Sequence, residues 1–462
     1  MPDTPDTPDT PNTPNTPNTS CPQSTPFHVP FTRRAMIRDG LLAVSAGMIM
    51  PTIFSRAVRA ASNAAHEGAR GGAHWAQAAQ GRTLIVVQMA GGNDGLNTLV
   101  PYSDGAYYSA RPTLAIAQAD VLHLNDRLGL HPALKALLPL WQQGHLAAIE
   151  GVGYPNPNLS HFAAMDIWQT LDLNGQGGQG WLGKYVAGLV DKDGHPFQSL
   201  AIGTSLPIAL NALSADVPVV ASPASYKLQP SLDGASAGTK GNAATNGANA
   251  RVETLLKLYN TYPRSAPYAA LLDATAQAAV DGGRQLDAAV AGYTPKATYP
   301  TTNFAKGLQV LAEVIVQGLG LRVGYVTLGG FDTHGAQADT QARLLQMLAE
   351  GLAAFYADLQ GHGAADNVVV MTWSEFGRRV EENASAGTDH GTAAPLFVLG
   401  NAVQGGVYGE PPDLTALDAN GNLVFTTDFR AVYATVLDRW LGAPATAVLG
   451  GDYGEQGFLP PA

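Results

Sequence analysis

The 462-residue sequence contains one cysteine, Cys21, which excludes an intramolecular disulfide and a cysteine metal site. Charged residues make up only 14% of the chain and leave a net charge of -11, so a basic surface for nucleic acid is not expected. No apolar run is long enough to span a bilayer stably. The fold must therefore be held by packing of the 45% of residues that are hydrophobic.

The N-terminal part of the chain differs in composition from the rest. Residues 1–30 begin with repeated Asp-Thr-Pro and Asn-Thr-Pro triplets, which lack core-forming side chains and predict disorder. Residues 31–60 place Arg33-Arg34 before a short apolar run and a small-residue cleavage site, so they resemble a twin-arginine signal peptide. Residues 61–81, rich in Ala, Gly and His, are expected to be a linker.

This signal predicts a periplasmic or secreted protein that folds before export. The twin-arginine translocase is therefore an expected partner. The alternative is an N-terminal anchor that stays uncut, but the apolar run from Leu41 to Phe54 is too short and too rich in Ala and Gly for a stable membrane span.

Short apolar runs alternate with helical patterns along residues 82–462, which we expect to form one domain. This alternation predicts an α/β fold with a mainly parallel central sheet and helices on both faces. His131-Pro132 opens one helical pattern, so His131 is expected to be a helix-start residue and not a ligand. Strands are predicted within 83–89, 145–152, 199–212, 322–328, 368–372 and 395–399, and helices at 131–143, 162–171, 181–190, 302–318 and 338–360.

The regular alternation is interrupted between about residues 172 and 300, where we expect an inserted region. Residues 231–250 within it are low-complexity Ser, Gly, Ala and Asn. That composition predicts a flexible loop.

Three predicted strands end in loops that carry potential metal ligands. They are Asp94 after the first strand, Asp332 and His334 after the second, and Glu375, Asp389 and His390 after the third. Carboxyl ends of parallel strands form one edge of a sheet, where α/β proteins bind ligands. Taken singly, each residue has an ordinary explanation, such as a turn cap or a loop histidine. Together they favour a site for Zn, Mn, Mg or Ca, which accept oxygen and imidazole ligands.

Ser160 and Arg378 are the candidate catalytic residues. Ser160 precedes the helix at 162–171, and its hydroxyl is either a plain N-cap or a nucleophile at a helix N-terminus, where anions are favoured. The residues alone favour the N-cap. Arg378 lies three residues after Glu375 and either pairs with it on a surface or serves as a fork-shaped donor to an anion.

Eight segments between about Arg82 and the C-terminus together resemble one known family. They are GGNDGLNTLVPY, GLHPALKAL, SHFAAMDIWQ, GWLGKY, GGFDTHGAQ, SEFGRRVEEN, GTDHGTAAPLFVLG and TTDFRAVYATVLDRWLG. The family is the bacterial exported domain-of-unknown-function family 1501, which is similar in fold to the alkaline phosphatase and sulfatase superfamily. The resemblance implies an alkaline-phosphatase-like core.

The resemblance also implies roles for the candidate residues. It assigns Asp94 to the first ligand, Ser160 to the nucleophile, Asp332 and His334 to the later Asp and His, and His390 to the final His. The sequence departs from the superfamily at Ser374-Glu375, where Asp-His is expected, and Asp332 and His334 lie closer together than in alkaline phosphatase. These departures imply one metal ion, or none, in place of two.

These observations predict an exported, metal-dependent hydrolase of phosphate or sulfate esters. A divalent ion would polarise the ester and lower the pKa of the Ser160 hydroxyl or of a water, while Arg378 would hold the anionic oxygens. The alternative is a non-catalytic exported protein that keeps the fold and binds a cell-surface polymer or assists the assembly of another protein. The departure at Glu375 favours this alternative.

Overall fold

The computed structural model describes residues 81–174, 178–189, 197–212, 217–221 and 284–461. The predicted disordered segment, the signal peptide, nearly all of the linker and the flexible loop at 231–250 lie outside these residues. All described residues belong to one unit of the chain, residues 52–462. No helix in the described part combines the length and apolar character that a membrane crossing requires.

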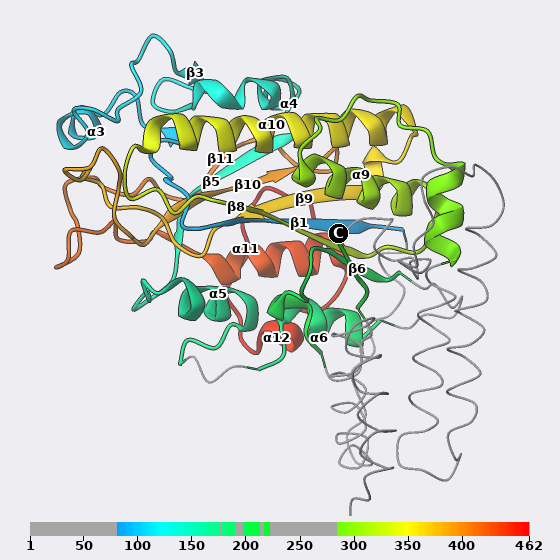
Figure 1. Ribbon diagram of the computed structural model, residues 1–462. Coiled ribbons are helices and arrows are strands. Elements are labelled where there is room, and N and C mark those ends of the chain that lie inside the picture. Colours follow the sequence, from blue (N-terminus) through cyan, green and yellow to red (C-terminus); the bar gives the residue numbers. More distant parts are fainter. Residues whose placement is uncertain (1–80, 175–177, 190–196, 213–216, 222–283, 462) are drawn as a thin grey trace, which may run out of the picture. The chain divides into compact units, whose positions relative to one another are not determined.

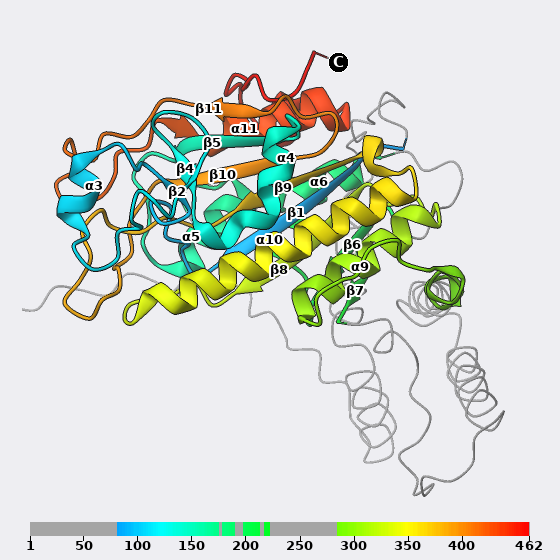
Figure 2. The same cartoon turned by 90° about the horizontal axis from the view of Figure 1, so that it is seen from above.

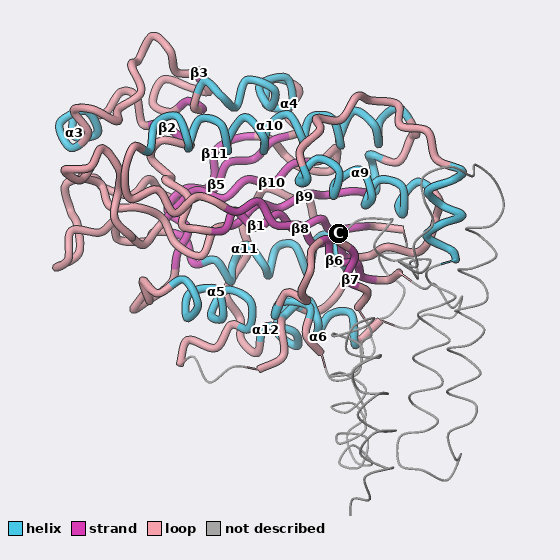
Figure 3. Tube along the Cα trace, viewed as in Figure 1, coloured by secondary structure: helices cyan, strands magenta, loops and turns pink. Residues whose placement is uncertain are grey.

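The described residues contain a nine-stranded sheet that forms the middle layer (Figure 3). Its strands are β1 (Thr83–Ala90), β5 (Leu146–Gly153), β6 (Ser199–Ile202), β7 (Val219–Val220), β8 (Val323–Gly329), β9 (Val368–Trp373), β10 (Ala394–Leu399), β11 (Gly406–Tyr408) and β12 (Thr427–Asp428). Their order is β11-β5-β10-β9-β1-β8-β6-β7, and β12 also pairs with β5. Among these pairs, only β10 runs antiparallel to its neighbours, β9 and β5. The predicted mainly parallel sheet is confirmed.

Helices cover both faces of this sheet (Figure 1). One face carries α4 (Leu138–Gln142), α9 (Asn303–Val316) and α10 (Gln337–Gly361), with 3-10 helices at Pro132–Leu137 and Ala365–Asn367. The other carries α5 (His161–Thr170), α6 (Trp181–Ala187), α11 (Phe429–Thr435) and α12 (Ala445–Leu449), with a 3-10 helix at Ile208–Leu210 and a π-helix at Val436–Leu441. In Figure 2, α10 lies over the sheet and runs in nearly the same direction as β1.

A small antiparallel sheet follows β1 along the chain. It consists of β2 (Leu99–Val100), β3 (Leu122–His123) and β4 (Gly129–Leu130), and the short helix α3 (Gly105–Ala110) lies between β2 and β3 in sequence. Asp104 caps α3 by accepting the N–H of Ala106 at 2.8 Å.

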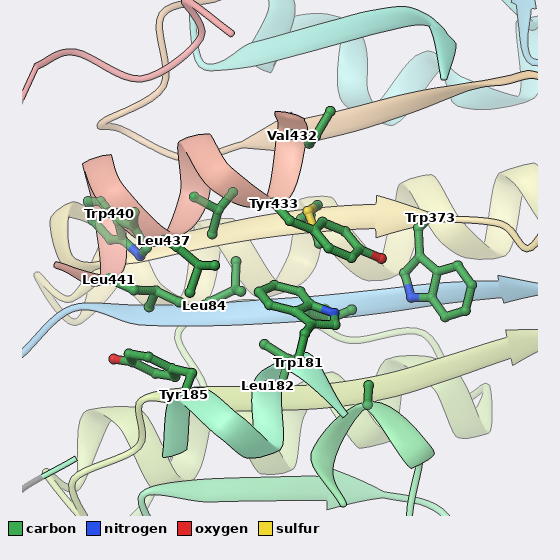
Figure 4. Packing of buried hydrophobic residues seen from close by; sticks show 14 of the residues in the cluster. Leu84, Trp181, Leu182, Tyr185, Trp373, Val432, Tyr433, Leu437, Trp440 and Leu441 are labelled. Carbon is green, nitrogen blue, oxygen red and sulfur yellow. The ribbon is translucent and has the colours of Figure 1, made fainter. Parts of the chain in front are cut away.

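Two apolar cores separate the sheet from its helices. Successive side chains of a strand point to opposite faces, so in β1 Leu84 and Val86 enter one core and Ile85 and Val87 enter the other. Figure 4 shows the first core, where helices from distant parts of the sequence meet β1. There the rings of Trp181 and Tyr433 stack with their centroids 4.2 Å apart. Burial of such aromatic side chains stabilises the fold by roughly 2 kcal/mol or more each.

Part of the expected inserted region belongs to the central sheet. β6 pairs in parallel with β8, from Ser199 opposite Val323 to Ile202 opposite Val326, and β7 extends the sheet beyond β6. The low-complexity composition of residues 231–250 indicates an insertion, and it gives no sign that the chain before it joins the central sheet. The apolar Leu200 and Ala201 are buried because they enter the two apolar cores on opposite faces of the sheet.

The strand order brings the predicted ligand loops together. β9, β1 and β8 are adjacent and parallel, so the loops after all three leave the same edge of the sheet. Because β10 is antiparallel to β9, the whole β9–β10 connection stays at this edge. The segment after β5 also starts there and leads into α5.

The buried His131 should make the stability of the fold depend on pH. It is the N-cap of the 3-10 helix at Pro132–Leu137, as expected, and its Nδ1 accepts the N–H of Ala133 at 3.0 Å. Burial lowers the pKa of His131 from 6.5 to about 4, although the charge of Asp94 opposes this shift. Its contribution to stability should therefore be complete above pH 6.5 and decrease as the pH falls towards 4, because the unfolded chain takes up the proton first.

The variant His131→Asn keeps a capping acceptor but does not titrate. Urea unfolding between pH 4 and 7 should show that the wild type loses up to about 3 kcal/mol more than this variant as the pH falls. Parallel curves for the two proteins would contradict a buried neutral histidine.

Candidate metal centre

The loops after β1 and β8 approach each other closely at the edge of the sheet. Gly91 has a φ of +118°, and a Cβ on it would lie 2.5 Å from the backbone nitrogen of Asp332. Only glycine fits this contact, since any side chain would push the two loops apart. The glycines that follow β1 thus allow the Asp332 loop to reach its position.

The carboxylate oxygen Oδ1 of Asp332 is the point on which three histidines converge. His334 Nε2 lies 3.0 Å from it, His390 Nε2 3.1 Å and His161 Nε2 3.5 Å. The potential ligand atoms of His161, Asp332 and His390 all lie within 4.8 Å of one another. His334 Nε2 is also 3.0 Å from His390 Nε2. Asp332 and His334 are about half exposed, with side-chain exposures of 48% and 47%.

The other nitrogen of each imidazole faces an acceptor. His161 Nδ1 lies 2.8 Å from Glu375 Oε1, and His334 Nδ1 lies 3.1 Å from Asp389 Oδ1. His390 Nδ1 lies 2.9 Å from the carbonyl oxygen of Leu159. Because these partners only accept, we infer that each Nδ1 carries the proton and that each Nε2 presents a lone pair. Such outer acceptors are typical of metal-ligating histidines.

A cation fits this arrangement of atoms. Three Nε2 lone pairs and a carboxylate oxygen converge, and without protons or a cation between them they would repel one another. The Nε2 of His161 is buried, and the described residues supply no hydrogen-bond partner for it. Nitrogen and oxygen donors in this number suit Zn²⁺ and related divalent ions.

The electrostatics of the site keep its carboxylates charged. Burial raises the pKa of the Asp332 carboxyl, but the hydrogen bond and the charge of the Arg378 guanidinium oppose it, and protonated His390 and His161 would act in the same direction as Arg378, so that this pKa is about 2. Hydrogen bonds from Asn383 and His334 lower the pKa of Asp389. Both carboxylates are therefore ionised at neutral pH, as ligation or support of a cation requires.

Arg378 does not take the predicted role of a donor to substrate. Its side chain is fully buried, and its guanidinium donates to the carbonyl oxygens of the three surrounding loops and to Asp332. These bonds run to Gly92 O at 2.6 Å, Thr388 O at 2.8 Å, Phe331 O at 3.0 Å, Gly91 O and Asp332 Oδ1 at 2.8 Å. Arg378 is thus a clamp that joins the loops and fixes Asp332.

Asp94 is not placed among the convergent ligands either. It is fully buried, and its Oδ2 pairs with Arg111 at 2.5 Å and accepts a hydrogen bond from Gln337. Gln337 Oε1 in turn accepts from Thr333 at 3.0 Å and from Thr388 at 2.6 Å. Asp94 follows β1 and points into the protein. There its buried ion pair with Arg111 supports the loops.

Glu375 and Asp389 lie in the site, where each carboxylate holds one of the histidines in position. Glu375 is fully buried, and its Oε1 accepts the N–H of Gly91 at 2.8 Å as well as facing His161. Asp389 holds His334 from the outer side. Neither carboxylate is part of the cluster of His161, Asp332 and His390 whose ligand atoms converge.

Ser160 occupies the N-cap position of α5 without capping it. It is exposed, and its hydroxyl accepts no backbone N–H of the helix. The favoured interpretation as a plain N-cap is therefore wrong. Both of its neighbours contact the centre, Leu159 through its carbonyl oxygen and His161 through its ring. These contacts leave the hydroxyl of Ser160 free for another role.

His161 is the site residue that the sequence did not reveal. The available signal was its place beside Ser160 at a helix start, in a segment shared with the family that the sequence resembles. It is aligned with the centre because α5 begins where β5 ends, at the same edge as the other loops. Its ring packs between those of Phe376 and His390, with centroid distances of 4.8 and 4.5 Å.

A cavity of about 500 Å³ lies beside the clamp but not at the histidines. Its wall includes Arg378 and apolar residues such as Leu96 and Leu128, together with the Arg127–Glu150 ion pair. None of the convergent histidines lines it. We therefore locate the chemistry at the cluster around Asp332 and not in this cavity, because among the described residues the potential metal ligands gather at that cluster.

Glu375 allows a test of this centre without changing a convergent atom. In Glu375→Gln the amide oxygen can still accept from Gly91, but the charged acceptor that orients His161 is lost. Zn²⁺ affinity, measured by competition with a chromogenic chelator, should fall about 10- to 100-fold. Glu381→Gln, an exposed change nearby, should leave it unaltered. Equal affinity of both variants and the wild type would contradict the supporting role of Glu375.

Known proteins give limited guidance to this site. No curated protein matches the chain significantly. Among solved structures, the lipoteichoic acid synthase LtaP from Listeria monocytogenes is similar at 10% identity and a TM-score of 0.33, over 82% of this chain and 74% of that one. PsFucS1 sulfatase from Pseudoalteromonas sp. is similar at 12% identity and a TM-score of 0.32, over 88% and 77%. These scores are too low to support a functional argument.

The match to a protein family is more extensive. The sequence model of the family described as "Protein of unknown function (DUF1501)" matches residues 81–449, which include every residue of the candidate centre. Because this match spans most of the chain, the protein belongs to the DUF1501 family.

Proposed function

We propose that the protein is an exported, metal-dependent hydrolase of phosphate or sulfate esters. The observation that carries the proposal is the convergence of three imidazole Nε2 atoms on Asp332 Oδ1. His161, His390 and Asp332, whose potential ligand atoms all lie within 4.8 Å of one another, would hold one divalent ion, and His334 lies beside them, 3.0 Å from Asp332 Oδ1 and from His390 Nε2. The bound ion would supply Lewis acidity, polarising the ester and lowering the pKa of an attacking hydroxyl or water.

The protein's own residues would position this chemistry. Glu375, Asp389 and the Leu159 carbonyl keep the imidazole Nε2 atoms directed inward. Arg378 holds Asp332 in place and keeps it ionised. These contacts are made before substrate arrives, so little reorganisation accompanies the reaction.

Ser160 is the proposed nucleophile. Its hydroxyl is exposed and uncommitted to capping, and it is flanked by two residues that contact the centre. The first turn of α5 also presents backbone N–H groups that favour a bound anion. A water molecule is the alternative nucleophile, and Ser160→Ala distinguishes them, because hydrolysis through water would survive this change.

The first experiment is a measurement of metal content. Protein purified from exported material without chelator should contain about one tightly held equivalent of Zn or Mn by elemental analysis, since the described residues form one cluster of potential ligands. It should then release nitrophenol from aryl phosphates or aryl sulfates. A protein that binds no ion under any loading condition would contradict the proposal.

Removal of a convergent residue should abolish both metal binding and ester hydrolysis. Asp332→Ala and His390→Ala should lose the metal and reduce hydrolysis by about a thousandfold or more, because the ion carries most of the charge stabilisation. Circular dichroism and thermal melts should show a folded protein in each case, since both side chains are partly exposed. His123→Ala, at an exposed histidine outside the centre, is the control. Full activity of either site variant would overturn the assignment.

A non-catalytic binding function is the second candidate. The specific observation in its favour is that Arg378, the expected oxyanion donor, is fully committed to backbone carbonyls and Asp332. On this alternative the ion is structural, and the exposed edge holds a cell-surface polymer or a protein partner. Metal binding without hydrolysis of any aryl ester would favour it.

A further inference from the structure

The cavity of about 500 Å³ beside Arg378 takes no part in the proposed chemistry. Five buried leucines contribute to its wall, Leu96, Leu99, Leu128, Leu414 and Leu423. Sites for small molecules have volumes of roughly 300–1,000 Å³ and are mostly apolar. Water against such a wall finds few hydrogen-bond partners, so an apolar group that replaces the water is favoured. The cavity therefore suits a ligand with an apolar body.

Two arginines in the cavity wall are each paired with a carboxylate. The Nη1 and Nη2 atoms of Arg127 lie 3.1 and 2.6 Å from the two carboxylate oxygens of Glu150. Arg378 pairs with Asp332 at 2.8 Å and also donates to backbone carbonyl oxygens. Neither arginine thus offers an unpaired positive charge to a ligand in the cavity.

Two aspartates in the same wall have no cationic partner among the described residues. The Oδ1 of Asp104 accepts the N–H of Ala106 at 2.8 Å. The Oδ1 of Asp413 accepts the N–H of Thr415 at 2.8 Å and that of Ala416 at 3.2 Å. These bonds occupy one oxygen of each carboxylate. The Oδ2 atoms of both aspartates remain without a hydrogen-bond partner in the part of the chain that the structure describes.

The exposed part of the cavity is therefore negatively charged. Its wall contains two arginines and three acidic residues. Glu150 balances Arg127, and Arg378 is balanced by Asp332, which does not line the cavity. This leaves Asp104, which is half-buried, and Asp413, which is exposed. The hydrogen bonds from Thr415 lower the pKa of Asp413, so this carboxylate is ionised at neutral pH.

We propose that this cavity binds a small organic cation, an ammonium or amidinium group attached to an apolar ring or short chain. The apolar body contacts the buried leucines, and the cationic group lies near Asp104 and Asp413. Both parts of the wall are needed, because the aspartates alone are ordinary surface carboxylates and the leucines alone select no charge. None of the histidines of the metal centre lines the cavity, so the site is separate from that centre.

Three ligands with one apolar body test the charge selection. 4-Phenylbutylamine is a cation at neutral pH, 4-phenylbutan-1-ol is neutral and 4-phenylbutanoate is an anion. Isothermal titration of the purified full-length exported protein at low ionic strength should give a Kd for the amine about tenfold below that for the alcohol. The butanoate should bind most weakly. Binding of the butanoate as tightly as the amine, or no binding of the amine, would overturn the proposal.

A fourth ligand tests the apolar part of the site. n-Butylamine keeps the ammonium group but lacks the ring, so it buries less apolar surface. Its Kd should exceed that of 4-phenylbutylamine by about tenfold or more. Equal Kd values would show that the ammonium group meets surface carboxylates without entering the cavity, which contradicts the proposal.

Asparagine variants test the two aspartates. Asp104→Asn and Asp413→Asn keep a side-chain oxygen for the backbone N–H groups but lose the charge. Each should raise the Kd of 4-phenylbutylamine about threefold and leave that of the alcohol unchanged. Asp418→Asn is the matched control, since Asp418 accepts the N–H groups of Asn420 and Asn422 in the same loop but does not line the cavity. Equal effects of all three variants would overturn the assignment.

His390→Ala separates the cavity from the metal centre. The Kd of 4-phenylbutylamine should be the same in this variant as in the wild type, because His390 does not line the cavity. Loss of binding would place the amine at the histidines and overturn the proposal. Neither metal content nor ester hydrolysis enters this measurement, so the proposed function and the cation site can fail independently.

Discussion

The buried guanidinium of Arg378 is the interaction on which the rest of the site depends. It donates to backbone carbonyls from the loops after β1 and β8 and from the β9–β10 loop, and to Asp332. A buried charge is tolerated only when such partners surround it, and removing one partner of a buried pair costs about 3–5 kcal/mol. The three loops are therefore held as one unit, although each leaves a different strand.

This clamp explains how an exposed centre can be well ordered. Asp332 and His334 are about half exposed, so packing alone would not fix their side chains. Each convergent residue is instead held from behind, Asp332 by Arg378 and the imidazoles by Glu375, Asp389 and the Leu159 carbonyl. Support from the outer side leaves the inner side open to solvent. An ion bound there, as we propose, would be accessible from solvent.

The guanidinium of Arg378 and the carboxylate of Asp94 are both used in contacts within the protein. Buried ion pairs add little net stability compared with apolar packing. Their value here is geometric, since they fix loops of different strands at separations of a few ångströms.

The sequence by itself determined the α/β class, most strands to within one or two residues, and the edge at which the ligand loops meet. It could do so because apolar runs and strand-end placement are local properties of the chain. It also singled out Asp332, His334 and His390, whose side chains the structure places side by side. Only the tertiary structure decided that His161 joins them, that Glu375 and Asp389 support them, and that Arg378 and Asp94 turn inward. The direction and partners of a side chain depend on strand order and on the antiparallel β10, which bring segments more than 200 residues apart into contact, and no local pattern contains that information.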